Sequence, residues 1–225
     1  SLYDPAPYRF DVVPVELLGS IYERFLGSTV TLKPSGRAKV DQKPEVRHAG
    51  GVYYMPRYIV DAISDRTLGP LVKGRTPEQL LELRVLDPAC GSGGFLIAAF
   101  EYLVQQHEAF YRGLATLPKK YRDQVVESGG GRRLTLPRKQ EILTRCIFGV
   151  DLDGQAVEVA QMSLYLKLLE GERDDSVSTQ LSIGATYLPT LVRNIRRGNS
   201  LISSQDLDPH AACTSPPDVP PFDSS

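Results

Sequence analysis

The stretch RVLDPACGSGGFL, from Arg84 to Leu96, says most about how this chain of 225 residues folds. It predicts a short apolar strand, an acidic residue at the end of that strand, a glycine-rich turn and the start of a helix. Proteins with alternating strands and helices build nucleotide-sized crevices at such carboxyl ends of strands. Glycine allows a positive φ and lets a ligand approach where a Cβ would stand. The stretch therefore predicts an α/β fold with a ligand crevice at this turn.

The acid of this stretch, Asp87, restricts the kind of ligand. A carboxylate repels a phosphate, but it can hold a cationic amine or accept hydrogen bonds from hydroxyls. A dinucleotide-binding turn follows G-x-G-x-x-G; here Gly91 and Gly93 fill the first two positions, but Leu96 stands at the third. A P-loop is excluded because no Gly-Lys-Ser/Thr follows. The turn favours a ligand that carries an amine or hydroxyls and no phosphate.

Two further strands complete the predicted sheet. The strand sequence CIFGV ends on Asp151 and leads into a helix, and a third strand over residues 192–197 leads to Asn199. With the first unit, these elements make a parallel βαβαβ half-sheet. Asp87 and Asp151 would then face one crevice and suit the vicinal hydroxyls of a ribose, with Leu152 against a purine and Asn199 at its edge. The plainer alternative is that both acids cap the helices that follow them.

Composition narrows the class of protein. The chain is 41% hydrophobic and 24% charged with a net charge of −1, so its overall charge gives no argument for nucleic acid. The three cysteines, Cys90, Cys146 and Cys213, are far apart in the sequence, and the chain has only three histidines. These numbers and spacings argue against a metal site. The cysteine usage suits a reducing cytoplasm. No apolar run is long enough to span a bilayer. We therefore expect a cytoplasmic protein without a metal or a membrane span.

The sequence divides into three parts. Residues 1–50 predict a mainly helical N-terminal extension, residues 51–205 the core, and the Pro- and Ser-rich residues 206–225 a flexible tail. Within the core, the basic, glycine-punctuated residues 114–136 are expected to be a mobile insertion. Both ends resemble cut points or frayed tails, so we expect a fragment. Helices are predicted over residues 14–26, 56–69, 77–83, 138–145 and 155–170, and a short hairpin around the turn at 33–36.

These motifs resemble a known family. VLDPACGSGGFLIAAF (residues 85–100) is similar to motif I of S-adenosylmethionine-dependent DNA adenine-N6 methyltransferases, and IFGVDLDGQAVEVAQMSLYL (147–166) to motif II. Within that group, the sequence resembles the methylase region of type I and type II restriction–modification systems, including fused restriction–methylation enzymes. Weaker matches are motif III at 194–202, motif X in AGGVYYMPRYIV (49–60), and the helix upstream of motif X in ELLGSIYERFL (16–26). The resemblance implies a Rossmann-like methyltransferase fold, with S-adenosylmethionine as cofactor and DNA as partner.

The resemblance also implies roles for individual residues. Asp87 and Gly91 would line the methionine end of the cofactor, and Asp151 would bind the ribose hydroxyls. Leu152 would lie against the adenine and Asn199 at its amino edge. The implied cofactor-binding set is Tyr54, Met55, Pro56, Asp87, Ala89, Cys90, Gly91, Phe95, Asp151, Leu152 and Asn199.

One member of this set departs from the family. The segment Tyr54-Met55-Pro56 would cover the methionine carboxylate, but the family more often has threonine where Met55 stands. The hydroxyl that would hold that carboxylate is therefore missing, and backbone N–H groups are left to hold it. Cys90, by contrast, is expected to be a small packing residue rather than a nucleophile.

A larger departure concerns catalysis. The catalytic motif of the family is Asn/Asp-Pro-Pro-aromatic after an apolar strand, and it holds and stacks on a flipped adenine. SPPD (215–218) lacks the aromatic residue, and VPPF (219–222) lacks the polar side chain. No apolar strand precedes either run, so both are expected to be linker. The sequence thus predicts no catalytic residue and a fragment that does not methylate DNA by itself.

Two other functions stay open at this point. The chain could be a non-catalytic methyltransferase-like scaffold in a restriction or phage-defence complex, with a vestigial pocket. It could also belong to a methyltransferase that acts on RNA or protein, which the match to motif X disfavours. In the restriction setting, a specificity or restriction subunit, or a fused domain, is the expected partner.

Overall fold

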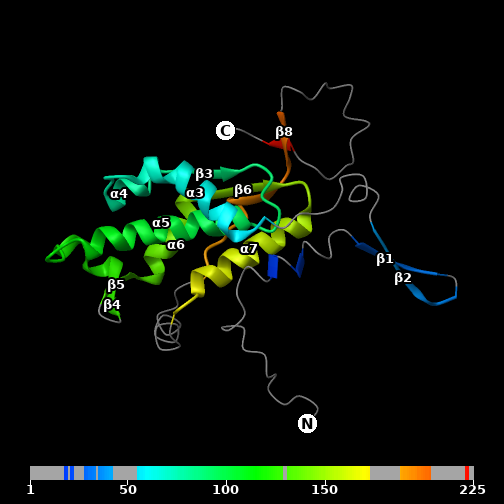
Figure 1. Cartoon of the computed structure of the whole chain (residues 1–225), viewed down its shortest axis with the longest axis horizontal. Helices are drawn as coiled ribbons and strands as arrows, with labels where there is room; N and C mark the ends of the chain where they lie inside the picture. The colour runs from blue at the N-terminus through cyan, green and yellow to red at the C-terminus, as the bar shows by residue number, and fades with distance from the viewer. Residues whose placement is uncertain are drawn as a thin grey trace, which may run out of the picture.

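The computed structural model describes the central part of the chain and some segments of its ends (Figure 1). Of the helix predicted over 14–26, only Leu18, Gly19, Ile21 and Tyr22 are among the described residues. Tyr54 lies outside the described residues. These comprise residues 18–19, 21–22, 28–33, 35–42, 55–128, 131–172, 188–203 and 221–222.

Three parallel strands form the sheet that the sequence predicted. They are β3 (Val85–Asp87), β6 (Ile147–Asp151) and β7 (Ile195–Arg197), in the order β3-β6-β7. Val85 pairs with Ile147, and Gly149 pairs with Ile195. Because the strands are parallel, Asp87 and Asp151 end at the same edge of the sheet. The prediction of a parallel half-sheet in an α/β fold is confirmed at this level.

Helices pack beside the sheet and form the core with it (Figure 1). The longest, α5 (Gly94–Arg112), follows the glycine-rich turn directly, and α7 (Gly154–Leu169) follows β6. Both helices bury apolar side chains almost completely, such as Leu103 of α5 and Leu164 of α7, which removes this apolar surface from water. Further helices of the described residues are α3 (Arg57–Val72), α4 (Pro77–Leu80) and α6 (Leu136–Cys146). None of the helices that the structure describes is long and apolar enough to cross a membrane.

Local sequence explains the start of α4 but not the end of α3. Thr76 caps α4 through a reciprocal pair of hydrogen bonds with Gln79. Helix α3 differs from the prediction, because it continues through Pro70 to Val72 instead of ending at Gly69. A proline costs the helix one backbone hydrogen bond. Since Leu68 and Val72 are both buried in the core, their packing extends the helix past that break.

The stretch expected to be a mobile insertion holds regular structure. It contains a 3₁₀ helix, η2 (Lys119–Gln124), and an antiparallel hairpin of β4 (Val125–Ser128) and β5 (Gly131–Leu134). Tyr121 and Leu134 are buried in the core. These elements were not predicted from the sequence, and the mobility of the segment in solution stays a prediction.

Two further strand pairs, besides the β4–β5 hairpin, lie outside the main sheet. The predicted hairpin is confirmed as β1 (Ser28–Leu32) and β2 (Ala38–Gln42), which pair antiparallel. After β7, β8 (Asn199–Ser203) pairs in parallel with β9 (Pro221–Phe222). The short β9 falls within residues 206–225, where only linker and tail were expected. The prediction of an unstructured stretch is therefore corrected at these two residues.

Candidate functional site

The glycine-rich turn takes a conformation that suits glycine. Gly91 has φ 53° and Gly93 has φ 89°, in the left-handed region that other residues rarely adopt. Gly93 also lies against α7, where a Cβ would come within 3.1 Å of the Cβ of Ala160. The backbone N–H of Gly93 donates to the carbonyl of Cys90 over 2.8 Å, which closes the turn. Both positive φ and close packing therefore explain the glycines of this motif.

The acid at the end of the second strand ties the two motifs together. Oδ2 of Asp151 accepts a hydrogen bond from the N–H of Gly91 over 2.8 Å, and Oδ1 accepts from the N–H of Asp153 over 2.9 Å. The carboxylate thus lies directly beside the glycine turn. Helix α7 is capped by Asp153, whose Oδ1 accepts from the N–H of Gln155, and not by Asp151. The alternative in which Asp151 is the helix cap is therefore wrong.

The acid of the first strand has a different environment. Oδ1 of Asp87 accepts a local hydrogen bond, from the N–H of Ala89 over 3.1 Å. Burial raises the pKa of Asp87, and the negative charge of Asp151 raises it further, against the lowering effect of that hydrogen bond. Two carboxylates at one crevice make it electronegative. Such a site favours a ligand that brings positive charge or hydroxyl donors.

Cys90 is a packing residue, as predicted. Its side chain is 6% exposed, and its N–H donates to the carbonyl of Val150 over 2.9 Å, which extends the contact between the first two strands. Gly149 leaves the room that its sulfur occupies. Burial, together with the charges of Asp151 and Asp87, raises the pKa of the Cys90 thiol to about 12. A thiol with that pKa is a poor nucleophile at neutral pH.

The end of the third strand crosses toward the other two. The N–H of Gly198 donates to the carbonyl of Asp151 over 3.0 Å, and the hydroxyl of Ser200 donates to the carbonyl of Pro88 over 2.8 Å. Asn199 lies between these two contacts, and its Oδ1 accepts from the N–H of Leu201. The structure therefore brings Asn199 to the strand ends that carry Asp87 and Asp151. Among the described residues, the amide NH₂ of Asn199 has no recorded hydrogen-bond partner, so it is the group that we expect to meet a ligand.

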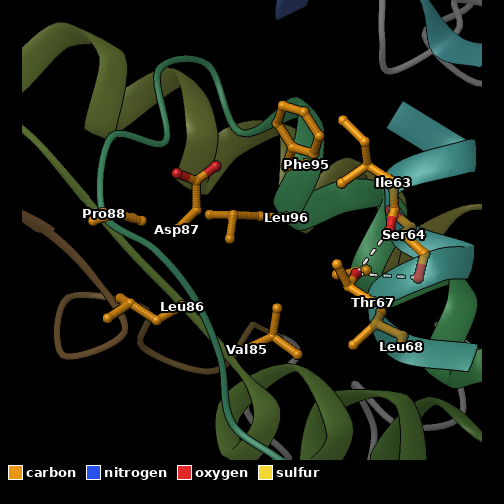
Figure 2. A pocket seen from close by; sticks show the side chains of 11 residues that line it. Ile63, Ser64, Thr67, Leu68, Val85, Leu86, Asp87, Pro88, Phe95 and Leu96 are labelled. Carbon is orange, nitrogen blue, oxygen red and sulfur yellow. Dashed lines mark hydrogen bonds between the residues drawn. The ribbon is translucent and has the colours of Figure 1, made fainter. Parts of the chain in front are cut away.

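A pocket of about 260 Å³ opens beside this turn, between α3, β3 and α5 (Figure 2). Asp87 and Phe95 come from the motif, and Ile63, Ser64 and Thr67 come from α3. The lining is mainly apolar, and the Asp87 carboxylate lies at one side of it, pointing away from Val85 and Leu68 (Figure 2). The hydroxyl of Thr67 donates to the carbonyl of Ile63. The pocket thus offers an apolar wall next to one acid.

The remaining predicted residues lie around these features. Leu152 follows Asp151 and is 57% exposed, so its apolar face is open. Ala89 is exposed on the turn, and Met55 and Pro56 are exposed where α3 begins. Tyr54 cannot be placed, because it lies outside the described residues. The structure thus brings the residues of the turn, the two acids and Asn199 together, and places Met55 and Pro56 at the start of the helix that lines the pocket.

Three polar groups at this site were not predicted from the sequence. They are the hydroxyl of Ser200, the capping carboxylate of Asp153, and the hydroxyl of Tyr22, which donates to Oδ2 of Asp153. Only Asp153 had a local signal, because an aspartate directly before a helix is a common N-cap. The other two act over more than a hundred residues of sequence, which no local pattern reveals.

Comparison with known proteins identifies the family. Residues 72–212, more than half of the chain, match the family model described as MmeI, DNA-methyltransferase domain. The chain belongs to the MmeI DNA-methyltransferase domain family. The matched region contains all three strands of the sheet and the glycine-rich turn. The stretches that resemble motifs I and II therefore lie within a methyltransferase domain.

One relative connects this chain to restriction–modification, and another to adenine methylation. The chain is 36% identical to the type II restriction enzyme and methyltransferase RM.Eco57I of Escherichia coli, over 92% of this chain and 20% of that protein. It is 31% identical to the adenine-specific methyltransferase PglX of Lacticaseibacillus casei, over 54% of this chain and 8% of that protein. The chain therefore spans about one fifth or less of the length of these relatives. It is related to the adenine methyltransferases of restriction–modification systems.

Proposed function

We propose that this chain is the S-adenosylmethionine-binding part of a site-specific DNA adenine-N6 methyltransferase of a restriction–modification system, with a Rossmann-like fold. The observation that carries the proposal is the hydrogen bond from Gly91 to Asp151. It holds the glycine turn of the first motif against the strand-end acid of the second. That juxtaposition makes one crevice from two motifs, as a nucleoside ligand requires.

Asp151 is the proposed ligand of the ribose. A carboxylate has about four acceptor positions, and Asp151 uses one on each oxygen for a backbone N–H. Each oxygen keeps a position for one of two vicinal hydroxyls. Leu152 would then contact a face of the adenine with its exposed side chain, and the Asn199 amide would lie at the amino edge.

The methionine end of the cofactor would lie toward Asp87 and the pocket beside it. S-adenosylmethionine carries a sulfonium and an ammonium group, and either reduces the repulsion between Asp87 and Asp151. Phe95 supplies an apolar wall there. Gly91, Ala89 and Cys90 form the turn, and the segment that contains Met55 and Pro56 would cover the carboxylate. A phosphate would meet the same two acids without compensation, which disfavours a dinucleotide.

The cofactor supplies a methyl group on a sulfonium sulfur for direct displacement by the adenine amino nitrogen. The residues of this chain bind and orient that donor. The acceptor base would be held by an Asn/Asp-Pro-Pro-aromatic motif, and the sequence of this chain contains no complete copy. We therefore expect the 225-residue chain to bind cofactor without methylating DNA. DNA, and a restriction or specificity partner, belong to the whole enzyme.

Calorimetric titration with S-adenosylmethionine tests the proposal. We expect the folded chain to bind, and Asp151→Ala to weaken binding by about 1–3 kcal/mol, because the hydroxyls lose a charged acceptor. The control is Asp123→Ala, which removes an exposed aspartate on η2 and should leave the dissociation constant unchanged. Absence of heat with the folded wild type favours a non-catalytic scaffold instead. An unchanged affinity in Asp151→Ala removes this carboxylate from the site.

A further inference from the structure

A hydrogen-bonded chain of residues leads from the N-terminal segment to the glycine turn. The hydroxyl of Tyr22 donates to Oδ2 of Asp153 over 3.0 Å, across 131 positions of sequence. The other oxygen of Asp153 accepts from the N–H of Gln155 over 2.9 Å and so caps α7. Tyr22 therefore holds the residue that fixes the start of this helix. Figure 1 shows the blue helical residues of this segment beside α7.

The chain continues into the candidate cofactor site. The N–H of Asp153 donates to Oδ1 of Asp151, and Oδ2 of Asp151 accepts from the N–H of Gly91. Each carboxylate in this series receives one bond on each oxygen. Asp151 cannot turn without breaking a bond either to the N-cap of α7 or to the glycine turn. Restraint at Tyr22 is thus transmitted to the carboxylate proposed to bind the ribose.

A second contact brings the same segment against the turn itself. A Cβ at Gly19 would lie 2.9 Å from Oγ of Ser92 and 3.3 Å from its Cβ. Ser92 belongs to the turn and is 4% exposed. Gly19 and Tyr22 are three residues apart, so they lie on one face of a helix. This face therefore contacts the first motif at Ser92 and the second at Asp153.

The Tyr22 hydroxyl remains a donor at all relevant pH values. Partial burial raises its pKa above the usual value, and the hydrogen bond to Asp153 adds to the effect. Asp153 lies at the N-terminus of α7, where its carboxylate accepts from the N–H of Gln155. The pair is thus a phenol that donates to a carboxylate, which is stronger than a hydrogen bond between neutral groups.

We propose that Tyr22 is a positioning residue for the cofactor site, which acts through Asp153 on the carboxylate of Asp151 and on the Gly91 turn. The inference rests on the proposed function for its ligand, but the restraint itself exists without one. If Tyr22 only stabilised the fold, its loss would lower the melting temperature and leave the affinity of the folded protein unchanged. A positioning residue changes the affinity as well.

The test compares two matched variants of the whole chain. Tyr22→Phe removes one hydroxyl that donates to an aspartate, and Tyr102→Phe removes another, which donates to Asp65 over 3.2 Å between α3 and α5. We expect Tyr22→Phe to raise the dissociation constant for S-adenosylmethionine about fivefold, the size of one hydrogen bond. Tyr102→Phe should stay within about a factor of two of the wild type.

Hydrogen exchange without ligand gives an independent result. Tyr22→Phe should speed exchange of the amide protons of Gly91 and Asp153, and Tyr102→Phe should not. If the wild type does not bind S-adenosylmethionine, the proposed function fails. If the exchange rates of Gly91 and Asp153 are also unchanged in Tyr22→Phe, the restraint by Tyr22 is wrong as well. If the wild type binds and Tyr22→Phe binds equally well, the positioning role is wrong while the proposed function stands.

Discussion

The two ends of helix α5 use polar residues in opposite ways. At its N-terminal end, the strand-end acids keep acceptor positions beside an open crevice, and Leu152 is 57% exposed. Toward its C-terminal end, His107 and Tyr111 are both 0% exposed. Tyr111 makes edge-to-face ring contacts with Phe110 and Tyr121, at 5.6 and 5.3 Å between ring centroids. The first end is the proposed ligand site, whereas the buried contacts of the second end contribute to stability.

We call the C-terminal end of α5 the closed end and its N-terminal end the crevice end. The hydrogen bonds of the closed end also serve the fold. The hydroxyl of Tyr111 donates to Gln124, and the Arg132 guanidinium donates to the backbone carbonyls of Tyr111 and Leu114, where the helix ends. Within the part of the chain that the structure describes, neither ring nitrogen of His107 has a hydrogen-bond partner. Tyr111 and Arg132 thus make hydrogen bonds within the protein, and His107 is buried without a partner among the described residues. Substitutions at this end should change folding, and those at the crevice should change binding.

The largest effect is expected at the aromatic contacts of the closed end. Tyr111→Ala should lower the free energy of unfolding by about 3–5 kcal/mol, because a fully buried ring is lost and a cavity remains. Denaturant titration measures this change. Tyr58→Ala, at a residue that is 73% exposed, is the control and should stay within about 0.5 kcal/mol. A loss below about 1 kcal/mol for Tyr111→Ala would contradict the described packing.

The next effect concerns pH at the same end. Burial lowers the pKa of His107 to about 3, and the charge of Arg138 adds to this, whereas unfolded histidine titrates near 6.5. Between those values only the unfolded chain binds the proton, so stability falls as the pH falls, by up to about 1.4 kcal/mol per pH unit. His107→Leu should remove this pH dependence of the free energy of unfolding. The variant should then be more stable than the wild type at a pH of about 4.5. Denaturant titrations at about pH 7 and about pH 4.5 measure it, and parallel losses in both proteins would refute the assignment.

A smaller loss is expected at the crevice end, from Gly93→Ala. The positive φ is strained for alanine, and its Cβ would meet Ala160, so stability should fall by about 1–3 kcal/mol. Gly94→Ala is the matched control, because a Cβ there meets nothing within 4 Å. Thermal melting of both variants gives the difference. Equal melting temperatures would show that the turn does not need a glycine at position 93.

The two ends also differ in how well the sequence predicts them. The crevice end was predicted, because an apolar strand, a glycine turn and a helix follow one another within thirteen residues. The β4–β5 hairpin near the other end of α5 was not predicted, because its charged and glycine-rich composition is also typical of loops. Its structure depends on distant contacts, such as the N–H of Leu134 donating to Glu108 and Arg132 binding the end of α5.

Within the site itself, residues were located from the sequence but their bonds were not. The strand ends placed Asp87 and Asp151 at one crevice, and the resemblance assigned their roles. The bond from Gly91 to Asp151 and the bond from Tyr22 to Asp153 depend on how separate units pack. Helix α3 gives the same lesson, since burial of its last turn carries it past a proline that local rules treat as its end.

The central claim is that Asp151 binds the ribose hydroxyls of the cofactor, and a thermodynamic cycle measures this contact directly. S-adenosylmethionine and its 2′,3′-dideoxy analogue are each titrated into the wild type and into Asp151→Ala. Loss of the hydroxyls should weaken binding to the wild type about tenfold or more and hardly change binding to the variant, because the partner of the hydroxyls is absent there. An equal loss in both proteins would contradict the claim, since the hydroxyls would then contact a different group.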